Sequence, residues 1–506
     1  MIFSSTKKFE KQMAQAESYA EWSKAAKNYD AAAGYDRWKI MDQSRRFDYV
    51  SIRVRLDRLR ALRARHDNHG LLLNLNEGIH GNVDGMGKRE LYQKAKFGTK
   101  QLVCDYVDEI VSALEHLADP KVNDISFEEK LDFFRRAHHC FGSTALMMSG
   151  SGSLLYFHVG VIRTLFKERL LPNIFSGSSG GSIVGSAVCT KSDDEIESTF
   201  DIENILFERE SRTGLFSLLD NIAPKPLDQE QIKEQIKKLI PDLTFQEAHA
   251  KTGRHMNIPI APAEHHQTSR LLNAFTSPNV MMRESILASS AVPGVYPPVT
   301  LMARSPQGER IAYLPSRKWV DGSVSDDLPA KRLARLYGAN HYIVSQTNPH
   351  VVPFVNDNKR NSDVSAILRH ATQNTIREWI NAGAEILRRP IKHNHTMNRL
   401  INMTISVINQ DYIGDINILP PTGVVNPFKV LATRTEKEIK KMILLGERST
   451  WPKIEMIRVQ TKIGRTLDRI LSDYEEHYID LIEKRSTNTK EMSAKVSSKK
   501  SGLKAV

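Results

Sequence analysis

The stretch NIFSGSSGGSIVGSAVCT, residues 173–190, places many small residues between two apolar ends. Its eighteen positions hold five Gly and Ala and six Ser and Thr. The apolar residues at its start are typical of a short strand, and the residues after Gly181 have the spacing of a helix. A strand that enters a helix through a tight turn needs small side chains, because the backbone passes close to itself there.

The turn itself, Gly177-Ser178-Ser179-Gly180-Gly181, fits the pattern G-x-S-x-G of a nucleophile elbow. Such a turn lifts the hydroxyl of Ser179 clear of the sheet and places it at a helix N-terminus. The helix dipole and the unpaired N–H groups there favour developing negative charge. Ser179 alone satisfies the register, so it is the candidate nucleophile, although a pattern this short also occurs by chance.

The segments around the elbow alternate between short apolar runs and helical patterns. Residues 144–150 and 171–177 are typical of strands, whereas residues 155–170 and 181–190 have helical spacing. Strand, tight turn and helix, repeated, predict an α/β fold with largely parallel central strands and flanking helices. Further strands are expected at 256–262, 318–323, 341–347 and 414–421.

A second glycine-rich turn lies in MSGSGSLLYFHVGV, residues 148–161, about thirty residues before Ser179. The backbone N–H groups of Gly150, Ser151 and Gly152 could point at the same small volume and form an oxyanion hole. An ordinary tight turn is the alternative. A nucleotide-binding loop is disfavoured, because no G-K-[ST] follows. His158 in the next helix is expected to pack inside the protein and not to complete a catalytic triad.

A candidate carboxylate lies in KWVDGSVSDDLP, residues 318–329. Asp321 follows an apolar pair and precedes glycine, a setting that suits a carboxylate at a strand end and also suits a simple Asx turn. Asp326 and Asp327 are expected at a loop or a helix start. A metal there is disfavoured, because one adjacent pair of carboxylates provides no complete ligand set.

Length, charge and cysteine content set the class of protein. The 506 residues can form more than one folded unit, and a net charge of +12 suits nucleic acid, anionic lipid or acidic partners without selecting one. Three scattered cysteines indicate a reduced compartment. We expect neither a signal peptide nor a transmembrane helix, because the longest uncharged run, 286–303, contains three prolines and a glycine.

The chain is expected to have four regions. They are a helical N-terminal region at 1–140, an α/β catalytic domain at 141–350, a mostly helical region at 351–485, and a disordered basic tail at 486–506. The N-terminal region contains the arginine-rich amphipathic helix 48–67 and a second helix at 100–117. A lid and a membrane-docking module are both compatible with this region.

At these residues the chain resembles the patatin-like phospholipase family. The elbow, the upstream glycine loop, ASSAVPGVYPP at 288–298 and the Asp-Gly at Asp321 occur in the family's order. The flanks resemble the triacylglycerol-lipase branch of the family, which has a helical N-terminal region. The resemblance covers nearly the whole chain. It departs at Leu155, where the family's loop has glycine, and at Ser323, where the family has glycine or alanine.

The resemblance implies a lipid acyl hydrolase that cleaves triacylglycerol or phospholipid esters through an acyl-enzyme. Ser179 would be the nucleophile and Asp321 the base of a Ser–Asp dyad, with Gly150, Ser151 and Gly152 as the oxyanion hole and no metal or cofactor. We expect a cytoplasmic protein that docks on a membrane or lipid droplet through basic helices and the apolar loop 293–303, and that binds no nucleic acid. The oligomeric state stays open.

Three alternatives remain at this point. The same acyl-enzyme could transfer its acyl group to a lipid acceptor, which would make the protein an acyltransferase. The chain could be a non-catalytic adaptor at a lipid surface, and Leu155 is the feature that keeps this possibility open. An ordinary Ser-His-Asp triad would require a histidine late in the chain.

Overall fold

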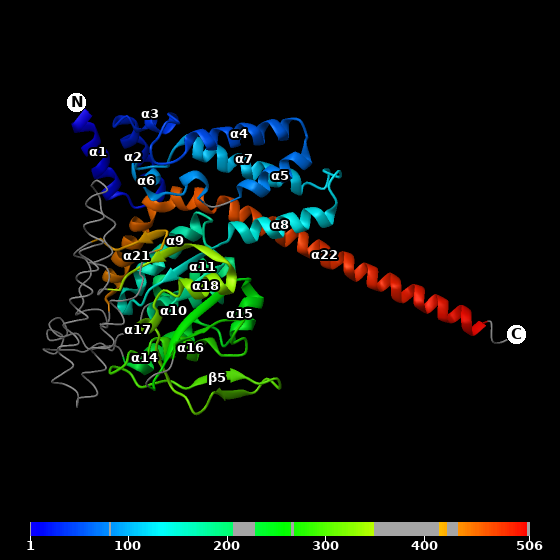
Figure 1. Ribbon diagram of the computed structural model, residues 1–506. Coiled ribbons are helices and arrows are strands. Elements are labelled where there is room, and N and C mark those ends of the chain that lie inside the picture. The colour runs from blue at the N-terminus through cyan, green and yellow to red at the C-terminus, as the bar shows by residue number, and fades with distance from the viewer. Residues whose placement is uncertain are drawn as a thin grey trace, which may run out of the picture. The chain divides into compact units, whose positions relative to one another are not determined.

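A computed structural model of the chain describes residues 2–79, 82–205, 228–264, 268–348, 414–421 and 434–502 (Figure 1). The chain forms two compact units. The first unit joins residues 1–29 to 144–457, and the second joins residues 30–143 to 458–506. The change of unit at 143/144 lies close to the expected boundary at 140, whereas the changes at 29/30 and 457/458 were not expected, because each unit combines segments that are far apart in the sequence. Within the expected region 351–485, residues 351–413 and 422–433 lie outside the described residues.

The first unit is built on a seven-stranded sheet in the order β4-β3-β2-β1-β8-β9, with β7 paired to β3. The pairs β1–β2, β2–β3 and β8–β9 are parallel, whereas β4 and β7 run antiparallel to β3. This confirms the expected α/β sheet with largely parallel central strands. The strands are β1 (Ser143–Met148), β2 (Ile174–Gly177), β3 (His255–Pro262), β4 (Arg270–Leu272), β7 (Trp319–Asp321), β8 (Ala339–Ser345) and β9 (Ile416–Ile418).

Helices connect and flank these strands, and a separate hairpin follows α16 (Figure 1). The principal ones for the site are α9 (Leu155–Lys167), α10 (Gly180–Cys189), α16 (Met282–Ser289) and α21 (Glu436–Thr450). The others are α1 (Ile2–Gln15), α2 (Tyr19–Ala32), α11 (Asp193–Thr199), α12 (Ile202–Ile205), α14 (Gln229–Leu239), α15 (Phe245–Thr252), α17 (Ser323–Asp326) and α18 (Ala330–Tyr337). The hairpin is β5 (Leu301–Arg304) with β6 (Arg310–Tyr313).

The helices α9 and α21 approach each other unusually closely, because each has a glycine at the contact. A Cβ atom on Gly160 would lie 2.0 Å from the carbonyl oxygen of Ile443, and one on Gly446 would lie 2.2 Å from that of Phe157. No side chain fits between the two backbones at these points. A helix from late in the chain therefore packs directly on the helix that follows the glycine loop.

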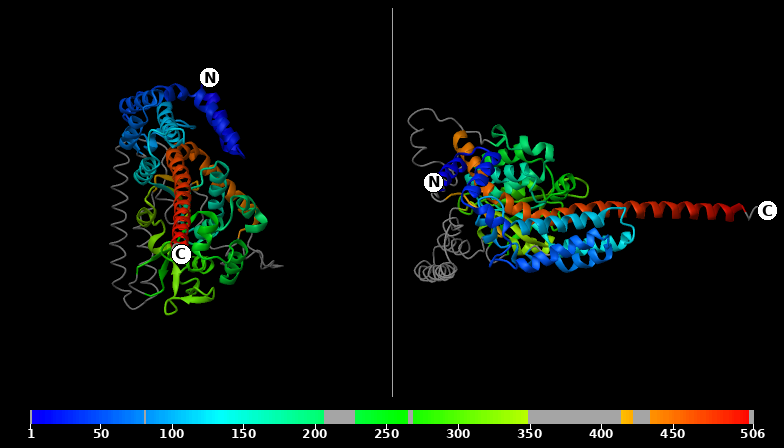
Figure 2. Two further views of the ribbon diagram at one scale, coloured as in Figure 1. Left: turned by 90° about the vertical axis from the view of Figure 1, so that its right-hand side faces the viewer. Right: turned by 90° about the horizontal axis from the view of Figure 1, so that it is seen from above.

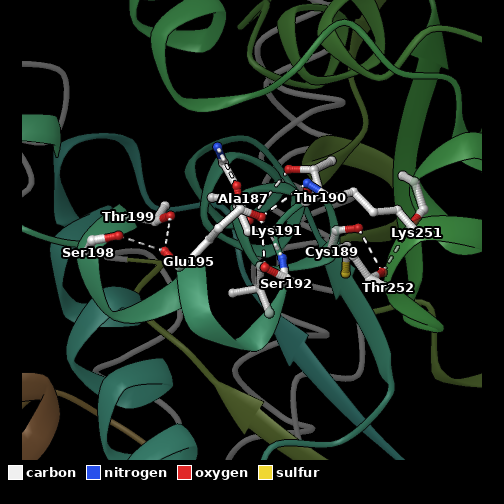
Figure 3. Close-up of polar contacts among 12 residues, drawn as sticks. Ala187, Cys189, Thr190, Lys191, Ser192, Glu195, Ser198, Thr199, Lys251 and Thr252 are labelled. Carbon is white, nitrogen blue, oxygen red and sulfur yellow. Dashed lines mark hydrogen bonds and ion pairs between the residues drawn. The ribbon is translucent and has the colours of Figure 1, made fainter.

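The far end of α10 is fixed by its neighbours (Figure 3). The hydroxyl of Thr252 donates to the carbonyl oxygen of Cys189 at 3.0 Å, and the Lys251 ammonium donates to that of Thr190 at 3.1 Å. Lys251 also contacts Glu195, which closes a capping box with Ser192 at the start of α11. These bonds satisfy the carbonyl groups that a helix leaves unpaired at its C-terminus, and so they fix the helix that carries the elbow.

The second unit is helical, as expected for the N-terminal region. It contains α3 (Tyr35–Ile40), α4 (Tyr49–Ala64), α5 (Asn68–Gly78), α6 (Arg89–Gln93), α7 (Gln101–Ala118), α8 (Phe127–Phe141) and most of α22 (Ile454–Gly502). The rings of Phe127 and Tyr474 stack with centroids 5.1 Å apart, which joins α8 to α22. On α4, Arg63 contacts the buried Glu109 of α7 at 2.7 Å, so part of the arginine run is structural. None of the described helices has both the length and the hydropathy needed to span a bilayer.

The expected disordered tail is helical up to residue 502. Figure 2 shows α22 as one continuous helix through this segment. The sequence from residue 454 onward contains no proline, and Lys, Glu, Arg and Leu, which are good helix formers, are frequent in it. The Lys- and Ser-rich composition of this segment predicted disorder, whereas the structure has a helix there.

Candidate active site

The elbow residue Ser179 has a backbone conformation that few side chains adopt. It lies between β2 and α10 with φ 49° and ψ −121°. This strain is typical of a nucleophile elbow, where the turn is held by its surroundings. A Cβ on Gly177 would lie 2.3 Å from the carbonyl oxygen of Gly181, and one on Gly181 would lie 2.6 Å from that of Met148, which explains why both ends of the pattern are glycine. The structure therefore has the sharp turn that the pattern predicted.

A serine from α16 holds the elbow in place. The Oγ of Ser289 accepts the N–H of Ser179 at 3.1 Å and donates to the carbonyl oxygen of Pro259 in β3 at 3.0 Å. On the other side of the turn, the hydroxyl of Ser182 donates to the carbonyl oxygen of Ser179 at 2.6 Å. Both backbone polar groups of the candidate nucleophile are thus engaged in holding the turn.

Strand pairing brings Asp321 to the same level of the sheet as Ser179. In the parallel pair β2–β3, Ser176 lies opposite Asn257. Three residues further along, Ser179 follows β2 and Ile260 lies in β3, so these two residues are at the same level of the sheet. Ile260 in turn pairs with Asp321. One edge of β3 pairs with β4. The other edge pairs first with β2 and then, beyond the last residue of β2, with β7. The end of β7 therefore meets the elbow.

Asp321 is buried, with an exposed fraction of 3%. Desolvation raises the pKa of its carboxyl group to about 7, although the N–H of Ser323, which it accepts at 2.8 Å, acts in the opposite direction. Within the described part of the chain, no hydrogen bond joins Asp321 to Ser179. Gly322, the next residue, packs against the Pro259 carbonyl to which Ser289 donates, because a Cβ on Gly322 would lie 2.4 Å from that carbonyl. Catalytic hydrogen bonds are often long without substrate.

The glycine loop lies against the start of α10. A Cβ on Gly180 would be 2.2 Å from the Oγ of Ser151 and 3.0 Å from the Cβ of Leu155. Leu155, which replaces the family's glycine, is buried as the first residue of α9 and fits because Gly180 has no side chain. Among the residues that the structure describes, the backbone N–H groups of Ser151, Gly152 and Gly180 have no hydrogen-bond partner. These three groups are candidate oxyanion donors.

Gly150 differs from the expectation for the oxyanion hole. Its N–H donates to Oδ1 of Asp327 at 2.7 Å and is therefore not available to an oxyanion in this arrangement. The sequence suggested Gly150 because it is the first glycine of the loop. It could not show that a carboxylate from a distant segment would occupy that N–H.

The adjacent carboxylates Asp326 and Asp327 serve different partners and do not form a pair. Asp326 makes an ion pair with Arg332 at 3.2 Å. Asp327 is fully buried, and burial raises its pKa to about 7 while the bond from Gly150 acts in the opposite direction. The nearby charge of Asp321 raises it further.

His158 is buried in α9, as expected, and its ring lies behind the glycine loop. Its Nδ1 lies 2.7 Å from the hydroxyl of Ser345, and its Nε2 lies 3.1 Å from the carbonyl oxygen of Ser149. Because that carbonyl can only accept, Nε2 carries the proton. Burial lowers the pKa of His158 to about 4, so the ring is neutral at physiological pH.

Sequence reasoning missed three groups at this site, namely the N–H of Gly180, Ser289 and Asp327. The first could have been found, because the residue after an elbow nucleophile commonly supplies an oxyanion N–H. Ser289 belongs to the run ASSAVPG, whose small residues gave no indication of a partner. The adjacent pair Asp326-Asp327 indicated a loop, a helix start or a metal ligand, and not a partner for the glycine loop.

The fold and the elbow define an α/β protein with a serine poised at a helix N-terminus. Residues 146–334 match the family model described as patatin-like phospholipase, and residues 2–139 match a domain of unknown function, DUF3336. The chain is 30% identical over 466 residues to triacylglycerol lipase ptl3 of Schizosaccharomyces pombe, which covers 88% of this chain and 93% of that protein. This chain belongs to the patatin-like phospholipase family.

Other relatives are longer. Triacylglycerol lipase 4 of Saccharomyces cerevisiae is 32% identical over 481 residues, covering 91% of this chain and 52% of that protein. A patatin-like phospholipase domain-containing protein of Cryptococcus neoformans is 29% identical over 489 residues, with shares of 91% and 54%. The chain thus spans about half the length of several curated relatives that it matches. The solved structure of VipD from Legionella pneumophila is 13% identical, with a TM-score of 0.30, and covers 64% of this chain and 67% of that chain.

Proposed function

We propose that the protein hydrolyses acyl esters of glycerolipids through a Ser179–Asp321 dyad. The observation that carries the proposal is the strained Ser179 at the start of α10, at the sheet level of a buried carboxylate. An Asp with an ordinary pKa is a poor base toward a hydroxyl group. A pKa near 7 brings Asp321 closer to the range in which a general base works at neutral pH.

The reaction has two stages. Asp321 takes the hydroxyl proton as the Ser179 oxygen attacks the ester carbonyl carbon, and the N–H groups of Ser151, Gly152 and Gly180 bind the resulting oxyanion. The intermediate then expels the alcohol of the lipid, which takes the proton from Asp321, and an acyl-enzyme remains. Water attacks that ester with Asp321 again as base, releases the fatty acid and restores Ser179.

A glycerolipid substrate is supported by the relatives named triacylglycerol lipase. Action at a membrane or lipid-droplet surface is a further part of the proposal. Phe275, Val295 and Ile311 of the first unit have exposed fractions of 55%, 45% and 44%, which suits contact with lipid. In the expected docking loop 293–303, Leu301 and Ala303 are buried in the hairpin, so only its first part can serve.

The test compares the wild type with S179A and D321N on triolein and on phosphatidylcholine. Both variants should lose at least about 10³-fold in fatty-acid release, because each removes an essential reactant. The control is S198A, which removes an exposed hydroxyl on α11 and should keep the activity of the wild type. Full activity of S179A on both lipids would overturn the proposal. Acylated glycerol formed from an added acceptor would instead identify an acyltransferase.

A further inference from the structure

The glycine loop is held at one particular peptide group, the one between Ser149 and Gly150. Its carbonyl oxygen accepts Nε2–H of His158 at 3.1 Å, and its N–H donates to Oδ1 of Asp327 at 2.7 Å. The two bonds lie at opposite ends of a planar group. Together they fix the rotation of that plane, because turning it would break both bonds.

Both holding side chains are buried and anchored elsewhere. His158 also contacts the hydroxyl groups of Ser345 and Thr347 at the end of β8, at 2.7 and 3.3 Å. The backbone carbonyl of Asp327 accepts the hydroxyl of Ser178 at 3.1 Å. Asp327 therefore joins the glycine loop to the elbow.

We propose that Asp327 and His158 are positioning residues, which clamp the Ser149–Gly150 peptide and thereby aim the next N–H groups, those of Ser151 and Gly152, at the oxyanion. This inference rests on the proposed function, since it concerns the donors of that reaction. Neither side chain is expected to touch substrate. The clamp acts through the direction of the donors, so it matters most where the negative charge is greatest, in the transition state.

The chemistry of the clamp gives a matched pair of variants at each position. Asn and Leu at 327 have nearly the same size and neither is charged, but only Asn can accept the N–H of Gly150. At 158, Gln can donate to the Ser149 carbonyl and Leu cannot. Comparing D327N with D327L, and H158Q with H158L, therefore isolates the hydrogen bond from the loss of charge or volume.

The measurement is steady-state hydrolysis of p-nitrophenyl butyrate, a soluble ester that requires no lipid surface, with the inhibition constant of a trifluoromethyl ketone as a readout of oxyanion binding. Each Leu variant should have a kcat about 10–100-fold below its amide partner, since an oxyanion donor contributes about 10²–10³-fold. KM should stay within about 2-fold, and affinity for the ketone should fall with kcat. D326N, at the carboxylate paired with Arg332, is the neighbouring control and should stay near wild type.

Equal kcat for the two members of each pair would overturn the clamp, as would a loss confined to KM with unchanged ketone affinity. If one Leu variant does not fold, the other position decides. An amide variant that folds but is as inactive as S179A also contradicts the clamp, because it keeps the required bond. If S179A is inactive while D327L and H158L are fully active, only the clamp is overturned. If S179A is active, the proposed function itself is overturned.

Discussion

Ser179 and Asp321 reach the same level of β3 from two different segments, one at the end of β2 and the other at the end of β7. The antiparallel course of β7 makes this possible. A parallel strand in that position would run in the same direction as β2, so its last residue, Asp321, would lie at the end far from the elbow.

The value of kcat/KM should fall about tenfold for each pH unit below about 7, because Asp321 must be ionised to act as a base and burial raises its pKa to about 7. The charge of Asp321 contributes to the raised pKa of the nearby Asp327, which is also buried. D327N is therefore the matched control, and it should keep the acidic limb if Asp321 is the base. A profile of p-nitrophenyl butyrate hydrolysis that is flat down to pH 5 would contradict the assignment of Asp321 as the base.

D321N should stabilise the protein at alkaline pH while abolishing activity. The folded-state pKa of about 7 is raised above the unfolded value of 3.8, so the stability contribution of this acid is fully present below pH 3.8 and is lost as pH rises through 7. The difference in unfolding free energy between D321N and the wild type should grow by about 4 kcal/mol between pH 4 and pH 8. Urea unfolding at both pH values measures it, and an unchanged difference would mean that Asp321 is ionised in the fold at ordinary pH.

His158 should have the opposite dependence. Its folded-state pKa, lowered to about 4 from 6.5, means that its contribution is present above pH 6.5 and is lost as pH falls through 4. Relative to H158Q, which does not titrate, the wild type should lose about 3 kcal/mol of unfolding free energy over that range. Nuclear magnetic resonance of the imidazole gives an independent value, and a His158 pKa near 6.5 would show that the ring is not buried as described.

The α9–α21 contact should not tolerate a methyl group. G160A and G446A each place a Cβ within 2.2 Å of a backbone carbonyl, so each should lower stability by about 1–3 kcal/mol or more. K167A, at an exposed position of α9, is the control and should change little. Thermal unfolding provides the measurement. If both glycine variants melt with the wild type, the two helices do not pack as closely as the structure has them.

Local sequence was sufficient for much of the fold. The runs of apolar residues that end in small residues predicted β1 and β2, and the glycine spacing predicted the turn at Ser179, because both are dictated by neighbours within a few residues. The burial of His158 followed from its place on an apolar helix. The hairpin β5–β6 and the antiparallel β4 were not predicted, since short strands without clear alternation carry little local signal.

The sequence by itself determined the elbow, because G-x-S-x-G between a strand and a helix has one sterically possible shape. Only the tertiary structure decided that Asp321 ends an antiparallel strand beside that elbow, and that Asp327 takes the N–H of Gly150. The reason is that strand order and buried hydrogen bonds depend on which distant segments pack together. A carboxylate has the same local sequence signature whether it becomes a base, a loop clamp or a surface ion pair.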